Sequence, residues 1–174
     1  MAEGGPPPKA RPAWTWGAAA AAPAFALDQA TKWWVLAHLM DPPRVIPITP
    51  FFNLVLGWNR GVSFGLLSAD HPATPWLLSS LALAVVVGLV VWTTRDRRPG
   101  MAASVGFIVG GALGNVVDRL RHGAVTDFLD FHVAGYHWPA FNLADTAIFV
   151  GVALLLLVGG RRDPAGAPTS AARP

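Results

Sequence analysis

Long apolar stretches alternate with short polar segments along this chain. A transmembrane helix needs about 20 mostly apolar residues to cross roughly 30 Å of hydrocarbon. The pattern predicts four such helices, over residues 13–39, 75–92, 101–117 and 138–160. The first differs from the other three because it contains Pro23, Asp28 and Lys32.

The start of the first stretch also resembles a cleavable signal peptide, because basic residues and an alanine run precede a segment of small residues. Amphipathic apolar sequence continues through Trp33, Trp34, Val35 and Leu36, which a processed signal peptide has no reason to carry. We therefore interpret residues 13–39 as a retained helix.

The segment 40–74, between the first two predicted helices, follows a different pattern. Its prolines between Pro42 and Pro50 exclude a long helix, and apolar residues such as Ile46 and Phe52 are strand formers bounded by turn residues. We expect a small extended or hairpin platform of β type here. Exposing such an apolar segment to water is unfavourable. The platform is therefore expected to lie against the outer membrane surface.

The composition agrees with a membrane protein. Of the 174 residues, 53% are apolar and 13% are charged, and the mean hydropathy is +0.43. An all-α membrane protein with one domain, over residues 13–162, is the expected class. The tails 1–12 and 163–174 are rich in Pro, Gly and Ala and are predicted to be disordered cytoplasmic segments.

Basic residues lie in three short clusters at the ends of the apolar stretches: Lys9 and Arg11; Arg95, Arg97 and Arg98; Arg161 and Arg162. With four spans all three clusters fall on one side, which is the cytoplasmic side by the positive-inside rule. Both termini are then cytoplasmic, and the segments around 40–74 and 119–137 face the outside. No basic stripe with interleaved aromatic residues is present, so no nucleic-acid partner is expected.

The chain has no cysteine, which excludes disulfides, thiolate catalysis and Cys-bound metals. His122, His132 and His137 lack the spacing of metal ligands and are interpreted as surface residues. The residues left for chemistry are therefore Asp, Asn, His, Ser and Lys.

Glycines repeat at four-residue spacing in the third stretch, at Gly106, Gly110 and Gly114. Such spacing lets another helix backbone approach closely. We interpret this face as a packing surface and not as part of the chemistry.

Ionisable residues in transmembrane segments cost several kcal/mol, so each needs a partner or a purpose. Asp28 and Lys32 share a helix face and can neutralise each other. The other polar residues recur near the predicted outer ends of the helices: Asn115, Asp118 and Arg119 on the third, Asn142 and Asp145 on the fourth, and Asp127 in the loop between them. Asp145 is placed about seven residues into the fourth helix. One polar cluster near the outer leaflet is the simplest interpretation.

Two acids that share a site do not both ionise easily, so one can hold a proton while the other activates water against a peptide carbonyl. Asp127 and Asp145 are the best pair, because one comes from a loop and the other from a helix. The alternative is that both acids only pair with Arg119, Arg121 or Lys32. A small proton-coupled transporter and a noncatalytic assembly factor are further alternatives, although no internal repeat or polar cytoplasmic half indicates transport.

Taken in order, these segments resemble the lipoprotein signal peptidases of bacterial inner membranes. The resemblance covers nearly the whole chain between its tails. The segments that carry it are Asp28-Gln29-Ala30-Thr31-Lys32, Asn59-Arg60-Gly61-Val62-Ser63-Phe64-Gly65, the run from Gly110 to Arg119, Val125-Thr126-Asp127-Phe128, and Phe141-Asn142-Leu143-Ala144-Asp145. One departure is Val62-Ser63, where small alanines are commoner in the family.

The resemblance implies an aspartic endopeptidase that removes signal peptides from diacylglyceryl-modified prolipoproteins by cleaving on the N-terminal side of the lipidated cysteine. It implies that Asp127 and Asp145 are catalytic. It also implies substrate-binding or supporting roles for Asp28, Lys32, Asn59, Gly61, Asn115, Asp118, Arg119 and Asn142. No metal or cofactor is implied. We expect a multi-pass monomer, surrounded by lipid, in the bacterial cytoplasmic membrane, with the site near the extracytoplasmic surface.

Overall fold

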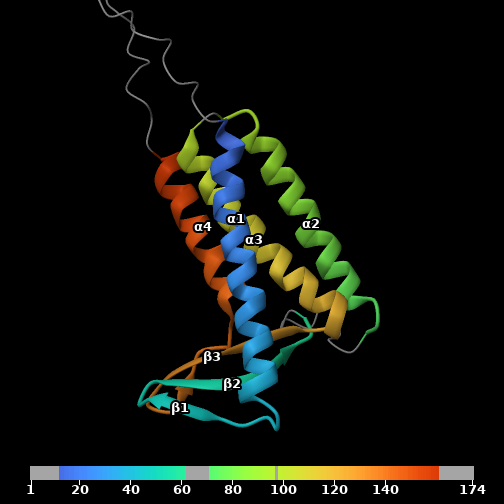
Figure 1. Cartoon of the computed structure of the whole chain (residues 1–174), viewed down its shortest axis with the longest axis vertical. Helices are drawn as coiled ribbons and strands as arrows, with labels where there is room; N and C mark the ends of the chain where they lie inside the picture. Colours follow the sequence, from blue (N-terminus) through green and yellow to red (C-terminus); the bar gives the residue numbers. More distant parts are fainter. Residues whose placement is uncertain (1–11, 62–70, 97, 161–174) are drawn as a thin grey trace, which may run out of the picture.

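The computed structural model describes residues 12–61, 71–96 and 98–160. Four helices form a bundle, and a small antiparallel sheet lies across one end of it (Figure 1). The start of α1, the α2–α3 turn and the end of α4 lie at the opposite end. The predicted disordered tails, apart from Pro12, and the Val62-Ser63 departure lie outside the described residues.

The four predicted helices are present, with bounds that differ from the sequence estimate: α1 Ala13–Trp34, α2 Thr74–Thr93, α3 Pro99–His122 and α4 Leu143–Gly159. α1 continues as a π-helical turn, η1 (Val35–Leu39), so the first predicted helix does reach Leu39. α3 is central, because α1, α2 and α4 all pack on it. Prolines at the first turns of α2 and α3 occupy positions where a missing N–H costs no helical hydrogen bond.

Two of the described helices, α2 and α3, are long and apolar enough to cross a membrane. α4 is equally apolar but has 17 residues. α1 carries the buried charges Asp28 and Lys32. Large apolar side chains along α2, such as Leu81 and Val87, are exposed, as expected for a helix whose outer face contacts lipid.

The fourth helix starts five residues later than predicted, at Leu143. The preceding residues form hydrogen bonds with the sheet: Trp138 donates its backbone N–H to Phe131, and Phe141 donates to Leu129. Asp145 therefore lies in the first turn of α4, and the predicted depth of about seven residues was wrong.

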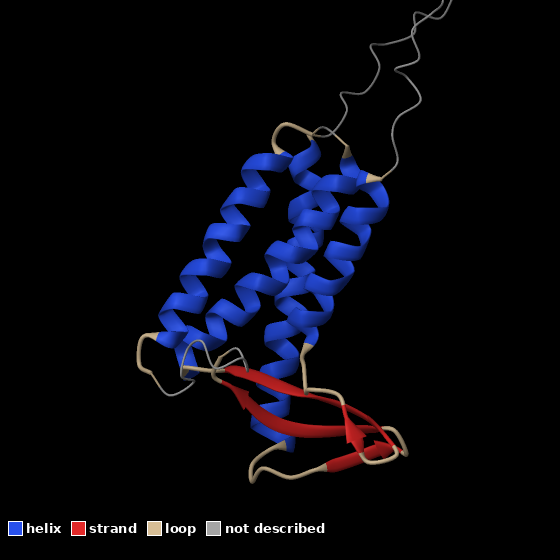
Figure 2. Ribbon diagram, turned by 180° about the vertical axis from the view of Figure 1, so that it is seen from behind, coloured by secondary structure: helices blue, strands red, loops and turns tan. Residues whose placement is uncertain are grey.

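The sheet has the order β1-β2-β3-β4, with β1 Ile46–Thr49, β2 Phe52–Asn59, β3 Val125–Val133 and β4 Tyr136–His137 (Figure 2). The hairpin predicted within 40–74 is confirmed, since β1 pairs with β2. The segment carrying Asp127 is a strand and not the predicted loop. β2 would otherwise present an unpaired edge, and β3 satisfies its backbone groups.

A small apolar core joins the sheet to the bundle. Val35, Met40 and Phe128 are buried together, with partly buried leucines from η1, β2 and α4 around them. α3 ends at His122, and the next residue, Gly123, has a positive φ of 70° and forms a left-handed helix cap that turns the chain toward β3. These contacts place Asp127 beside the first turn of α4.

The glycine face of α3 is confirmed as a packing surface for α1. A side chain at Gly106 would strike the backbone of Gly17, and one at Gly110 would lie 2.5 Å from the Ala21 carbonyl oxygen. Gly114 differs, because a side chain there would strike the Asp28 carboxylate. Gly114 therefore makes room for the polar cluster and is not only a packing residue.

Candidate active site

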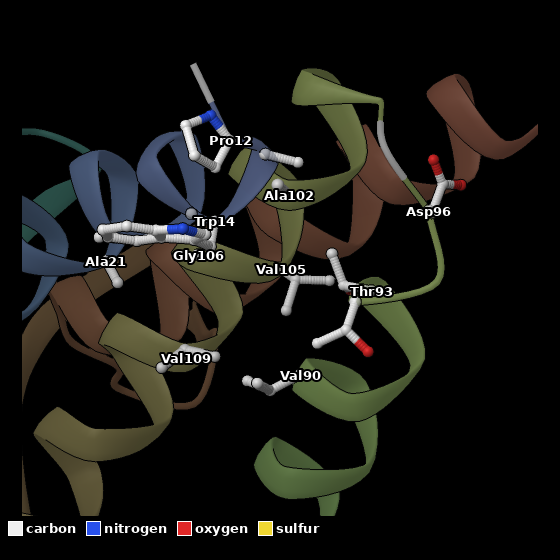
Figure 3. A pocket seen from close by; sticks show the side chains of 14 residues that line it. Pro12, Trp14, Ala21, Val90, Thr93, Asp96, Ala102, Val105, Gly106 and Val109 are labelled. Atoms are coloured by element: carbon white, nitrogen blue, oxygen red, sulfur yellow. The ribbon is translucent and has the colours of Figure 1, made fainter. Parts of the chain in front are cut away.

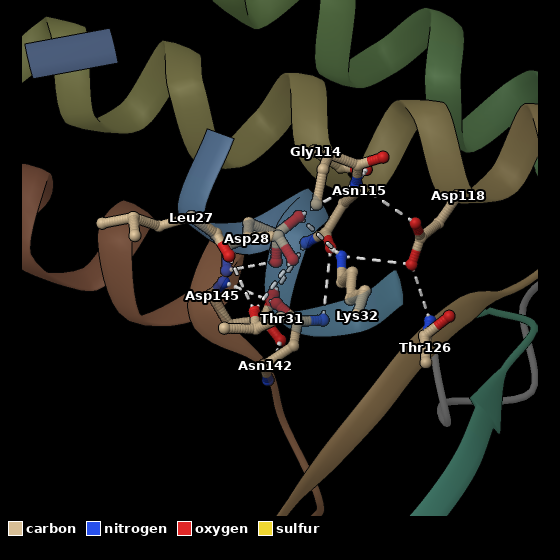
Figure 4. A network of polar contacts seen from close by, with 12 residues as sticks. Leu27, Asp28, Thr31, Lys32, Gly114, Asn115, Asp118, Thr126, Asn142 and Asp145 are labelled. Carbon is tan, nitrogen blue, oxygen red and sulfur yellow. Dashed lines mark hydrogen bonds and ion pairs between the residues drawn. The ribbon is translucent and has the colours of Figure 1, made fainter. Parts of the chain in front are cut away.

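The predicted polar residues meet at the end of the bundle that carries the sheet (Figure 4). They come from α1, α3, α4, β2 and β3, and their side chains form one hydrogen-bonded network. Its members are Asp28, Lys32, Asn59, Asn115, Asp118, Asp127, Asn142 and Asp145. The sequence prediction of a single polar cluster thus agrees with the contacts.

Lys32 is the centre of this network. Its Nζ lies 3.0 Å from Asp28 Oδ2, 3.1 Å from Asp118 Oδ2 and 3.0 Å from Asn115 Oδ1. Lys32 is 2% exposed, and these three acceptors match the three donors of an ammonium group. Asp28 and Lys32 are therefore paired as predicted, but they do not form a closed pair.

Asp28 connects α1 to α4. Its Oδ1 accepts the backbone N–H of Ala144 at 2.9 Å, one of the amides in the first turn of a helix that has no intrahelical partner. Gln29, its neighbour, donates to Asp28 Oδ2 at 3.1 Å and to the Gly114 carbonyl at 3.2 Å. The three helices α1, α3 and α4 are thus joined at one point.

Asp145 is held by a reciprocal helix cap. The Asn142 side-chain oxygen accepts the Asp145 N–H at 3.0 Å, while Asp145 Oδ2 accepts the Asn142 N–H at 3.3 Å. Asn115 Nδ2 donates to Asp145 Oδ1 at 2.8 Å. Both carboxylate oxygens therefore have fixed donors.

Asp127 is 3% exposed and accepts hydrogen bonds from two amides. Asn142 Nδ2 donates to its Oδ1 at 2.7 Å, and Asn59 Nδ2 donates to its Oδ2 at 3.1 Å. Asn59 reaches it because Asn59 pairs with Val125, which places Asn59 and Asp127 on the same face of the sheet. Burial, together with the negative charge of nearby Asp145, raises the pKa of Asp127 to about 6 against the lowering effect of the two amides and Lys32.

Asp118 positions β3. Its Oδ2 accepts the Thr126 N–H at 2.9 Å, so the residue before Asp127 is anchored to α3 and, through Lys32, to α1. Arg119 is half-buried and interacts electrostatically with Asp118, Asp127 and Asp145. Within the described ranges its Nε is buried and makes no hydrogen bond. Thus the cation beside the two acids keeps an unused donor.

Gly61 lies at the edge of this site. Its N–H donates to the Asn59 side-chain oxygen at 3.2 Å, which orients the Asn59 amide so that its nitrogen faces Asp127. Gly61 therefore acts on Asp127 through Asn59.

Two features were missed from the sequence. Gln29 belongs to the network, and the signal available was a third polar residue beside Asp28 and Lys32 in an apolar stretch. A second cluster lies farther along β3, where Asn53 donates to Asp130 Oδ2 at 2.9 Å and His137 Nδ1 lies 2.8 Å from Asp130 Oδ1. Only strand register brings Asn53 opposite Asp130, so the sequence alone gave no signal for this cluster.

The histidines agree in part with their interpretation as surface residues. His122 and His137 are exposed, whereas His132 is half-buried and stacks on His137. No group of three or more His, Asp or Glu suited to a metal ion occurs within residues 12–61, 71–96 and 98–160.

Asp127 and Asp145 share one partner residue, Asn142, whose side-chain amide donates to Asp127 and whose backbone N–H donates to Asp145, and the charge of Asp145 acts on Asp127. Two neighbouring carboxylates suit general acid and base catalysis on one bond. A helical bundle that holds two neighbouring carboxylates has the arrangement expected of a membrane peptidase of the aspartic type. The chain belongs to the signal peptidase II family, whose sequence model matches residues 20–159.

Curated relatives agree with this assignment. The chain is 45% identical over 138 residues to a lipoprotein signal peptidase of Rhodopseudomonas palustris (strain TIE-1), covering 76% of this chain and 84% of the relative. It is 46% identical over 152 residues to one from Azoarcus sp. (strain BH72), covering 85% and 86%.

The fold is also similar to solved structures. Two structures described as a bacterial membrane enzyme superpose with TM-scores of 0.70 and 0.73, at 25% and 27% identity. Each match covers 84% of this chain, and 92% and 94% of the solved chains.

Proposed function

We propose that this chain removes signal peptides from prolipoproteins and that Asp127 and Asp145 are its catalytic carboxylates. The observation that carries the assignment of the two acids is the position of Asn142, which donates to Asp127 and caps Asp145. The family likeness implies a diacylglyceryl-modified substrate, cut on the N-terminal side of its lipidated cysteine.

The mechanism follows from a pair that shares one proton. The ionised carboxylate accepts a proton from water as the water oxygen attacks the scissile carbonyl carbon, and the protonated acid donates its proton to the carbonyl oxygen. The tetrahedral intermediate then collapses, the C–N bond breaks, and the leaving amine takes a proton from the pair. We assign Arg119 to bind a backbone carbonyl of the substrate, and its buried Nε, which makes no hydrogen bond within the described residues, supports this role.

We assign the remaining residues supporting roles. Asn59, Asn115 and Asn142 orient the two carboxylates, and Gly61 orients Asn59. Asp28, Lys32 and Asp118 hold the elements that carry the acids. These residues set geometry and do not exchange protons with the substrate.

The membrane arrangement belongs to the same proposal. All four helices of the domain 13–162 cross the bacterial cytoplasmic membrane, both termini are cytoplasmic, and the sheet and the acids lie at the extracytoplasmic surface. The support is that Arg95 and Arg98 follow α2 at the bundle end opposite the sheet, where the positive-inside rule places the cytoplasm. α4 spans about 26 Å at 1.5 Å per residue, close to the hydrocarbon thickness. The enzyme acts as a monomer on a substrate that arrives laterally in the bilayer.

The direct test is cleavage of a lipidated prolipoprotein peptide by the purified full chain, with the new N-terminus identified by mass spectrometry. We expect the product to begin at the lipidated cysteine. Cleavage elsewhere, or equal cleavage of the unlipidated peptide, would contradict the proposed substrate.

The arrangement in the membrane needs its own test. Single cysteines placed in this cysteine-free chain at Arg95 and at Val133 report the two ends of the bundle. We expect a membrane-impermeant thiol reagent to label the Val133 position, but not the Arg95 position, in intact spheroplasts. The reverse pattern would invert the topology.

A further inference from the structure

A cavity of about 670 Å³ lies at the bundle end away from the sheet, between α1, α2 and α3 (Figure 3). It exists because α2 packs on α3, while α1 contributes mainly small residues to the lining, such as Gly17, Ala18 and Ala21, together with Trp14 at the start of the helix. Figure 3 shows the Val90, Val105 and Val109 side chains lying between the helices. The volume falls within the roughly 300–1,000 Å³ of cavities that hold small ligands.

The lining is chemically suited to an apolar ligand. The Thr93 hydroxyl donates to the Leu89 carbonyl at 2.8 Å, and the Thr94 hydroxyl donates to the Val91 carbonyl at 2.7 Å. Asp96 is paired with Arg98 at 2.7 Å. These polar side chains therefore already have partners within the protein and offer little to a polar ligand.

Charged residues lie next to the cavity at the α2–α3 turn. Hydrogen bonds from Arg98 hold the pKa of Asp96 below its usual range, so this carboxylate is ionised and offsets Arg98. Arg95 lies in sequence between the lining residues Thr94 and Asp96, and its exposed side chain adds a positive charge next to the cavity. Trp14 and Trp92 are exposed nearby, as is usual at the level of lipid headgroups.

A cavity open to the bilayer does not stay empty, because its lining would lose dispersion contacts and an apolar space in lipid excludes water. We propose that this cavity binds one acyl chain of an anionic glycerophospholipid from the cytoplasmic leaflet, with the phosphate held at Arg95. The bound chain would link α1 to α2 across the gap. This inference rests on the membrane arrangement proposed above.

The test uses the full chain reconstituted in phosphatidylcholine vesicles that contain a trace of phosphatidylglycerol with a photoactivatable acyl chain. We expect mass spectrometry to locate the label on peptides covering 13–21, 90–96 and 102–109. Excess unlabelled phosphatidylglycerol should compete better than excess phosphatidylcholine. Label spread evenly over exposed positions such as Leu81 and Leu157 would mean ordinary bilayer contact and would overturn the proposal.

Two pairs of variants sharpen the test. Ala18→Trp fills the cavity, whereas Ala19→Trp places the same side chain on an exposed position outside the lining. Labelling should be lost only in A18W, with V109W as a second filling variant if A18W does not fold. Arg95→Gln should abolish the preference for phosphatidylglycerol. Arg121→Gln, at the end of α3 next to the sheet, should retain it.

The alternative occupant is the apolar segment of the signal peptide. Displacement of the label by an unlipidated signal peptide would identify that occupant and contradict the lipid assignment. Labelling is measured without cleavage, and thiol accessibility reports topology separately. A failed lipid site therefore remains distinguishable from a failed proposed function.

Discussion

α1 and α3 are joined in two different ways along their length. Over the half nearer the Arg95 end, glycine and alanine backbones touch, as at Gly106 against Gly17 and Gly110 against Ala21. Over the half nearer the sheet, the same two helices are joined by charges, with Lys32 bound to Asp118 and Asn115.

The difference separates stability from chemistry. Close backbone contact holds the helices without any group that could react, whereas hydrogen bonds and ion pairs hold the carboxylates of the polar half in place. The polar half also carries the acids on α4 and β3, through Asn115 and Thr126. Changes in the polar half should therefore affect cleavage directly, and changes in the glycine half should affect only the amount of folded protein.

The largest effect is expected at the acids. Asp127→Asn or Asp145→Asn removes one of the two carboxylates proposed to exchange the proton, so kcat/KM should fall by about 10²–10⁴-fold or more. Because the two acids act as a unit, the double variant should be little worse than either single one. Peptide cleavage and lipopeptide binding are the measurements.

Asp130→Asn is the matched control for the acids, since Asp130 lies on the same strand and is also buried. Its hydrogen bonds from Asn53 and His137 outweigh burial and set the pKa of Asp130 below the ordinary value. D130N should retain cleavage. Additive losses in the double variant of Asp127 and Asp145, or an inactive D130N, would show that the pair is misassigned.

The next effect concerns Lys32. Lys32→Met leaves Asp28 and Asp118 as buried carboxylates without a counter-charge, which costs about 3–5 kcal/mol. Thermal unfolding in detergent should show this loss, while Arg121→Met, at an exposed position of α3, should show almost none.

Exchanging Asp28 and Lys32 tests whether the pair is self-contained. A closed pair would survive the exchange, because the two opposite charges would still face each other. The contacts with Ala144, Asp118 and Asn115 require each charge at its present position, so we expect the exchanged protein to be as unstable as K32M.

The sequence predicted this polar half well, because charged residues in apolar stretches are costly and must meet. It could not place Asp127 on a strand, since the pairing of β3 with β2 joins segments about 70 residues apart in sequence. It also placed Asp145 too deep. Asn142 caps α4 because the residues before it are still hydrogen-bonded to β3, and the sequence does not show where those hydrogen bonds end. The cavity beside α2 depends on how α2 tilts on α3, which apolar periodicity does not encode.

A smaller effect is expected in the glycine half. Gly110→Ala forces a methyl group against the Ala21 carbonyl and should cost about 1–3 kcal/mol. Gly88→Ala is the matched control, because nothing lies within 4 Å of a side chain there, and it should gain roughly 0.5–1 kcal/mol. Thermal unfolding measures both. Cleavage per folded molecule should stay unchanged in G110A, and a specific loss of kcat would contradict the separation of the two halves.

The smallest effect is a shift in pH dependence. A pair that needs one proton loses activity as pH rises through the higher pKa, so kcat/KM should decline above about pH 6, where Asp127 ionises. Asn59 stabilises the carboxylate form and lowers this pKa, so Asn59→Ala should raise it and move the decline upward by roughly one pH unit. Asn53→Ala removes an equivalent amide from Asp130 and should leave the decline in place. A profile unmoved by N59A, or moved to lower pH, would mean that Asp127 is not the group whose ionisation ends activity.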